Sequence, residues 1–263
     1  MMLAVAWASF RRHATYRQAT VAAAVTNTVF GCLRVFVLLA VATAGGGGAA
    51  GYTTAQLSGY VWVGQGLLGT VALWGWTELA DRVRTGEVVT DLLRPINPLW
   101  TYLAGDLGRA LHAAGTRLLV PIAFGALVFP FHWPRNPAGC PLFVMSCLLA
   151  VVVCFMMRYL VNLTAFWLLD SRGVMIVWTL ASGVLGGLYF PIDFLPGPIA
   201  AVLRYATPFP SILQIPADVL VERGGLGSQL VNIGVQALWV AVGLAAALWV
   251  QRAATRKLVI QGG

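Results

Sequence analysis

Long apolar runs dominate the chain, and most polar residues gather in the connections between them. About 20 consecutive apolar residues are enough for a helix to cross a bilayer. The pattern predicts six membrane-spanning helices, at about 20–44, 55–77, 108–130, 141–168, 174–193 and 229–250. We therefore expect an all-α, polytopic membrane protein with a single transmembrane domain over residues 1–263.

The segment before the first run has an amphipathic pattern. Leu3, Trp7, Phe10 and Ala14 recur at the spacing of one helix face, and the arginines of the segment lie off that face. We expect residues 1–19 to form an interfacial helix, with its aromatic side chains at the acyl boundary and its arginines at the lipid headgroups.

Two connections differ from ordinary loops. Residues 78–98 combine charges at helical spacing with apolar residues and reach Pro95, which predicts a short helix that ends before this proline. Residues 191–227 hold six prolines but stay apolar. Proline stops regular helix, so we expect short re-entrant or interfacial helices on the outer side, buried in protein or facing a wet cavity.

Composition supports the membrane assignment and explains the charge. Apolar residues make up 59% of the chain and charged residues 10%, against about 25% charged in soluble domains. The net charge of +8 reflects topology, and we expect no nucleic-acid partner. Basic residues concentrate in the connections that lie inside if both termini are cytoplasmic: Arg11, Arg12, Arg17, Arg82, Arg84, Arg94, Arg109, Arg117, Arg172, Arg252, Arg256 and Lys257, against Arg135, Arg204 and Arg223 outside.

The sequence offers no catalytic motif. It has no GxxxxGK[ST] loop for ATP, no HExxH and no GxSxG, and its three histidines are dispersed. The four cysteines form no CxxC pair, so we expect small buried apolar residues and neither a metal site nor a cofactor in this chain. We place no Asp or Glu within the spans, which argues against an intramembrane enzyme and a proton-coupled carrier.

A few polar residues do fall within the predicted spans. Asn27 and Arg34 are seven residues apart on one stripe of the first span, and Gln65 lies midway along the second. An arginine near the bilayer midplane costs at least about 2.5–3.5 kcal/mol unless it is satisfied. These residues could line a translocation pathway or a contact with a second protomer. The alternative is that Arg34 has a structural role and is bonded to carbonyl groups. For Arg158 and Asn162 of the fourth span, the structural role is favoured.

Three stretches resemble one family. Residues 83–98, with their G-E-x4-L-L-R-P pattern, resemble the cytoplasmic coupling segment of ABC-2-type permeases. Residues 51–57 are similar to the beginning of the second span in this family, and residues 188–196 to its outer connection. The resemblance implies six spans, inside termini and a second permease subunit, identical or paralogous. It also implies a pair of ATP-binding subunits that carry ATP and Mg²⁺. The ATPase-coupling residues would be Arg84, Gly86, Glu87, Asp91, Leu92, Leu93, Arg94 and Pro95.

The sequence therefore predicts a permease subunit of an exporter, in contact with lipids of a bacterial plasma membrane. All basic residues but Lys257 are arginines, which is typical of GC-rich bacterial genomes. The alternative is a stand-alone channel or secondary carrier, for which the charges of 78–98 would form a solvated loop. Drugs, lipids, glycolipids and peptides all remain open as substrates.

Overall fold

Helices make up almost all of the computed structural model, which describes residues 1–15, 17–168 and 171–257. Their bounds are α1 Met2–Ala14, α2 Arg17–Ala44, α3 Thr54–Thr70, α4 Glu78–Thr85, α5 Val88–Leu92, α6 Pro98–Ala113, the π-helical η1 Ala114–Leu118, α7 Leu119–Val128, α8 Gly139–Leu163, η2 Thr164–Phe166, α9 Arg172–Leu185, η3 Ile192–Phe194, α10 Gly197–Ala206, η4 Phe209–Ser211, α11 Gln214–Leu220 and α12 Gly225–Thr255. A small antiparallel hairpin of β1 Gly48–Ala49 and β2 Tyr52–Thr53 links α2 to α3.

Four helices in the described residues are long and apolar enough to cross a membrane: Thr20–Ala44, Pro98–Val128, Gly139–Phe166 and Gly225–Thr255. The predicted first, fourth and sixth runs correspond to three of them. The third begins ten residues before its predicted start, because the Asn97 side chain accepts a hydrogen bond from Leu99 N and Pro98 occupies the first turn. The fifth run is a shorter apolar helix, α9, of 14 residues.

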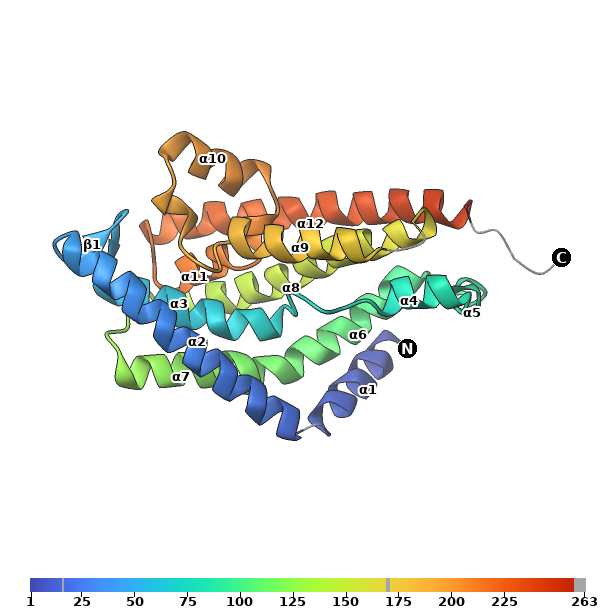
Figure 1. The fold of residues 1–263 in the computed structure, drawn as a ribbon, viewed down its shortest axis with the longest axis horizontal. Helices are drawn as coiled ribbons and strands as arrows, with labels where there is room; N and C mark the ends of the chain where they lie inside the picture. The colour runs from blue at the N-terminus through green and yellow to red at the C-terminus, as the bar shows by residue number, and fades with distance from the viewer. Residues whose placement is uncertain (16, 169–170, 258–263) are drawn as a thin grey trace.

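Helix α3 is the central helix, and α2, α7 and α11 surround it (Figure 1). Most of its side chains are fully buried. The indole of Trp62 lies between glycines of two neighbouring helices. A Cβ added to Gly31 would lie 2.5 Å from the ring, and one added to Gly125 would lie closer still. Small residues at these positions let the helices approach closely.

The second predicted run, 55–77, is wrong as a continuous helix, since α3 ends at Thr70 and residues 71–77 are irregular. Ala72 and Gly75 have positive φ angles of 48° and 85°. Buried irregular backbone needs hydrogen-bond partners at membrane depth. Side chains from three other helices supply them.

Five carbonyl groups at the end of α3 accept side-chain hydrogen bonds. Arg109 donates to Gly69 O at 3.2 Å and to Thr70 O at 2.9 Å, and Arg158 donates to Val71 O at 3.1 Å. Further along, Trp178 donates to Leu73 O at 2.8 Å and Asn162 to Trp76 O at 3.0 Å. These bonds replace the helical ladder and support the structural role expected of Arg158 and Asn162.

A carboxylate balances part of this arginine charge. Asp106 accepts from Arg109 Nε and from Arg158 Nη2, each at 2.8 Å, and its residue is only 8% exposed. The expectation of no Asp within the spans is therefore wrong, because the early start of α6 at Pro98 carries Asp106 into an apolar helix. We call Asp106, Arg109 and Arg158 the arginine hub.

The four cysteines differ in burial. Cys147 and Cys154 are buried and Cys32 is half-buried, as expected for small apolar residues, whereas Cys140 is exposed in the first turn of α8. All four are free thiols. Among the described residues, no group of three or more His, Cys, Asp and Glu side chains is placed to hold a metal ion.

Candidate functional site

The charged segment 78–98 lies at the same end of the molecule as the N-terminus and the end of α12 (Figure 1). It forms two short helices, α4 and α5, in place of the single helix predicted to end before Pro95. Gly86, with a φ of 79°, ends α4 in the left-handed region, where a side chain would be strained. The sharp turn brings α5 back alongside α4.

The base of this segment is anchored in the core. Leu79 and Val88 are each 2% exposed and belong to an apolar cluster with Phe155, Tyr159 and Leu163 of α8. The backbone N–H of Ala80 donates to Asn162 Oδ1 at 3.1 Å. The base of the segment therefore packs directly against α8.

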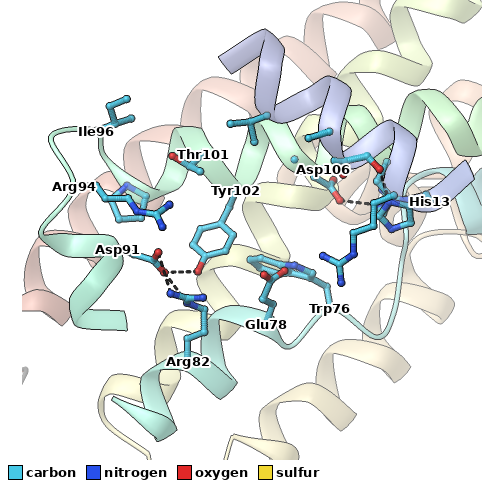
Figure 2. A pocket seen from close by; sticks show the side chains of 17 residues that line it. His13, Trp76, Glu78, Arg82, Asp91, Arg94, Ile96, Thr101, Tyr102 and Asp106 are labelled. Atoms are coloured by element: carbon cyan, nitrogen blue, oxygen red, sulfur yellow. Dashed lines mark hydrogen bonds and ion pairs between the residues drawn. The ribbon is translucent and has the colours of Figure 1, made fainter. Parts of the chain in front are cut away.

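An ion pair ties α4 to α5 and to α6 (Figure 2). Arg82 Nε lies 2.8 Å from Asp91 Oδ2, and Arg82 Nη2 donates to Asp91 Oδ1 at 3.1 Å and to Thr90 Oγ1 at 3.0 Å. The hydroxyl of Tyr102 donates to Asp91 Oδ2 at 2.8 Å. Such charge-assisted, two-point contacts fix both position and orientation.

Eleven residues of the segment are exposed, and we call seven of them the exposed tip: Arg84, Thr85, Gly86, Glu87, Leu93, Arg94 and Pro95. The Glu87 side chain is 63% exposed and Leu93 is 79% exposed. Asp91, Leu92 and Leu93 are among the expected coupling residues, but Asp91 is buried and Leu92 packs against the apolar cluster. Of these three, only Leu93 is available to a partner.

A cavity of about 530 Å³ lies behind the segment, between α1, α4, α5 and α6 (Figure 2). Its walls carry charges of both signs, including Arg12, Glu78, Arg82, Asp91 and Arg94. The cavity therefore separates α1 from the contacts of Arg82 and Asp91.

The three residues expected to line a pathway are only partly brought together. Asn27 Nδ2 donates to the backbone oxygen of Gln65 at 3.4 Å, and the Gln65 residue is 2% exposed. Arg34 lies about 10 Å further along α2, at 1.5 Å per residue. Its three guanidinium nitrogens are buried without a hydrogen-bond partner in the described part of the chain, within electrostatic reach of Tyr60 and Tyr189.

The end of the molecule opposite the exposed tip holds a buried polar network that sequence reasoning missed. Arg204 Nη2 lies 2.7 Å from Asp193 and 2.9 Å from Asp218, and Arg223 Nη1 lies 2.6 Å from Asp193. Tyr52 donates to Asp218 at 2.6 Å. A signal existed, because carboxylates and arginines within one apolar stretch must pair to avoid the cost of burial. We call these five residues the outer network.

Comparison with known proteins agrees with this architecture. The family model of the ABC-2 family transporter proteins matches residues 31–262, almost the whole chain. No curated protein and no solved structure matches it. The matched region includes the central helix, the arginine hub, the segment 78–98 and the outer network. The chain therefore belongs to the ABC-2 transporter family, as a multi-pass permease subunit that associates with an ABC ATPase.

Proposed function

We propose that this chain is the permease of an ATP-driven exporter and that its exposed tip is the contact with the ATP-binding subunits. One observation carries the proposal: residues 78–98 expose charges at the tip while their base is built into α8 and α6. A push on the tip would reach α8 through Leu79, Val88 and Ala80, and α6 through Asp91 and Tyr102.

The chemistry of the tip suits a protein partner. Leu93 supplies an exposed apolar side chain to the tip, and Arg84, Glu87 and Arg94 supply exposed charges of both signs. Interfaces commonly combine an apolar centre with charges at the rim, where the charges steer association and set orientation.

In the topology that we propose, α2, α3, α6 to α7, α8, α9 and α12 are the six spans. At 1.5 Å per residue, α3 is about 26 Å long and α9 about 21 Å, against a hydrocarbon core of about 30 Å. Beyond α3, the chain with its hydrogen-bonded carbonyl groups continues the second span across the bilayer. Helices α10 and α11 form the outer re-entrant segment. Both termini lie in the cytoplasm of a bacterial cell, and α1 lies in the inner interface.

Arg34, whose guanidinium has no hydrogen-bond partner among the described residues, supports a translocation pathway along α2. A guanidinium at this depth costs at least about 2.5–3.5 kcal/mol without a partner, so water or a polar substrate group is its natural neighbour. Asn27 and Gln65 would continue the pathway toward the cytoplasm. We propose that a second permease subunit, identical or paralogous, forms the opposite wall, because α2 exposes apolar side chains such as Val29 and Phe36.

The test is a charge reversal at the tip. Glu87→Arg and Leu93→Asp change exposed side chains, so we expect both variants to fold and to insert into the membrane normally. The amount of ATP-binding subunit that co-purifies with each variant should fall at least tenfold. Arg252→Glu is the matched control, since it reverses an exposed charge at the end of α12, outside the segment. ATP hydrolysis by the reconstituted complex is measured in parallel.

The alternative, a channel or carrier without an ATPase, has a distinct outcome. If both tip variants keep the ATP-binding subunit and the wild-type rate of ATP hydrolysis, the exposed tip is not the coupling element. If no ATP-binding subunit purifies with the wild-type permease, the proposed ATP-driven function is overturned as well.

A further inference from the structure

A second cavity, of about 360 Å³, lies beside the end of α3, where α1, α2 and the π-helical segment η1 meet. Arg109, His112 and Arg117 line it from α6 and η1, His13 from α1 and Asn27 from α2. The volume is far larger than the roughly 30 Å³ share of one water molecule, so a phosphate-sized group fits inside.

The cavity is basic and lacks a counter-charge. None of its described lining residues is an Asp or a Glu. Arg109 is balanced by Asp106, but Arg117 makes no hydrogen bond or ion pair within the described part of the chain. A half-buried guanidinium without a partner is costly, and a bidentate anion such as phosphate is its best complement.

The backbone is shaped to present this arginine. The long helix Pro98–Val128 becomes π-helical over Ala114–Leu118. π-Helical turns inside α-helices occur frequently at functional sites. The stem of Arg117 lies on Gly69, where an added Cβ would come within 2.7 Å of Arg117 Cδ. The glycine and the π-helical turn together leave the guanidinium at the cavity wall.

Apolar side chains flank the cavity on the same helices. Val21 of α2 is 63% exposed, and Leu111 of α6 and Leu119 of α7 are 64% and 59% exposed. Val21 and Leu111 are chain neighbours of the lining residues Thr20 and His112, and Leu119 lies two residues after the lining residue Arg117. A ligand whose anionic group enters the cavity can therefore lay an apolar chain against the membrane-facing surface beside it.

We propose that this cavity binds the phosphate headgroup of an amphiphile, with Arg117 as its principal charged contact and the acyl chain along α2 and α7. Basic pockets between spans on the cytoplasmic side suit anionic headgroups. The amphiphile is either a resident membrane lipid or the transported molecule. Assignment to the inner leaflet, and the transported source, rest on the proposed function, whereas binding itself does not.

The test measures binding to the full-length permease in neutral detergent. The probe is phosphatidic acid with a fluorophore on its acyl chain, followed by anisotropy and competed with unlabelled phosphatidic acid, phosphatidylcholine and glycerol 3-phosphate. Phosphatidic acid is expected to compete at least tenfold better than phosphatidylcholine, which carries a compensating positive charge. It should also compete better than glycerol 3-phosphate, which has no acyl chain.

Two pairs of variants separate charge from shape. Arg117→Gln should weaken probe binding about tenfold or more, as expected for loss of a hydrogen bond to a charged group, whereas Arg252→Gln, at an exposed arginine of α12, should leave it unchanged. Ala23→Trp fills the cavity without changing its charge and should also weaken binding. Its control is Ala22→Trp, one position along α2 on the exposed face.

Three results would overturn the proposal: equal competition by phosphatidic acid and phosphatidylcholine, equal competition by phosphatidic acid and glycerol 3-phosphate, or wild-type binding in both Arg117→Gln and Ala23→Trp. The source of the ligand is then settled in proteoliposomes that contain the permease with its ATP-binding subunit. ATP-dependent movement of the labelled lipid across the bilayer identifies it as cargo, and its absence identifies a resident lipid. Because binding needs no ATPase, failure of the exporter proposal remains distinguishable.

Discussion

The two ends of the molecule both gather Asp and Arg side chains, but they use them differently. In the outer network, Asp193 pairs with both Arg204 and Arg223, and Asp218 pairs with Arg204, so opposite charges neutralise one another within the protein. In the segment 78–98, only the Arg82–Asp91 pair is internal in this way. The charges of the exposed tip remain on the surface.

This difference separates charges that stabilise from charges that are available for recognition. Buried ion pairs must be complete, because one partner left alone keeps its full desolvation cost. Exposed charges contribute little to stability, since water and salt screen them. We therefore expect substitutions in the outer network to change folding, and substitutions in the exposed tip to change association.

The largest effect is expected from Arg204→Leu. It leaves Asp218, which is 1% exposed, without its arginine, so the free energy of unfolding should fall by about 3–5 kcal/mol. This loss is measured by heating the detergent-purified protein and monitoring the remaining folded fraction by size-exclusion chromatography. Arg135→Leu, at an exposed arginine on the same side, is the control and should have no effect. Equal melting temperatures for the two variants would contradict the distinction between the ends.

The arginine hub should behave like the outer network, with a somewhat smaller effect. Asp106→Asn keeps the size of the side chain but leaves Arg158 and Arg109 without a negative partner, while both keep their bonds to the carbonyls of α3. A loss of about 2–4 kcal/mol is expected. Proteolysis in the 71–77 segment should increase in parallel. An unchanged melting temperature and cleavage pattern would show that the α3 end does not depend on Asp106.

A double-mutant cycle on Arg82 and Asp91 tests the internal pair of the segment 78–98. The Arg82 side chain is 26% exposed and that of Asp91 12%, so screening reduces the interaction to about 1–2 kcal/mol. Arg82→Ala, Asp91→Ala and the double variant are compared by thermal unfolding. A coupling energy near zero would place this pair with the exposed charges.

The smallest effect is expected from protonation of Glu222, which lies between α11 and α12. Burial disfavours the charged form of Glu222, but the N–H groups of Arg135 and Asn136 and the ring of His132 outweigh it and hold the Glu222 pKa below its usual value near 4.5. Because the pKa of Glu222 is lower in the folded than in the unfolded protein, its ionised carboxylate stabilises the fold at pH values above the unfolded pKa. This contribution to stability is lost as the pH falls through the folded pKa. The melting temperatures of wild type and Glu222→Gln should therefore converge below about pH 4.5. A constant difference down to pH 3 would contradict this.

The position of the candidate site followed largely from sequence, but the roles of its residues did not. Charge density and Pro95 marked 78–98 as a segment outside the apolar spans. Asp91 and Glu87 are both acidic residues of that short stretch, yet one is buried against Arg82 and Tyr102 and the other is exposed. That assignment depends on Gly86, whose left-handed turn folds α5 back on α4.

The membrane class and the long helices could be predicted from the sequence alone, because hydropathy and run length are local properties and an apolar run in a bilayer can satisfy its backbone only as a helix. It could not determine where α3 ends, since Val71, Leu73 and Trp74 continue the apolar run beyond Thr70. The break exists because Arg109, Arg158 and Trp178, from three other helices, donate to the carbonyls that a longer helix would have bonded itself. Those contacts join residues that are distant in sequence, so only tertiary packing decides them.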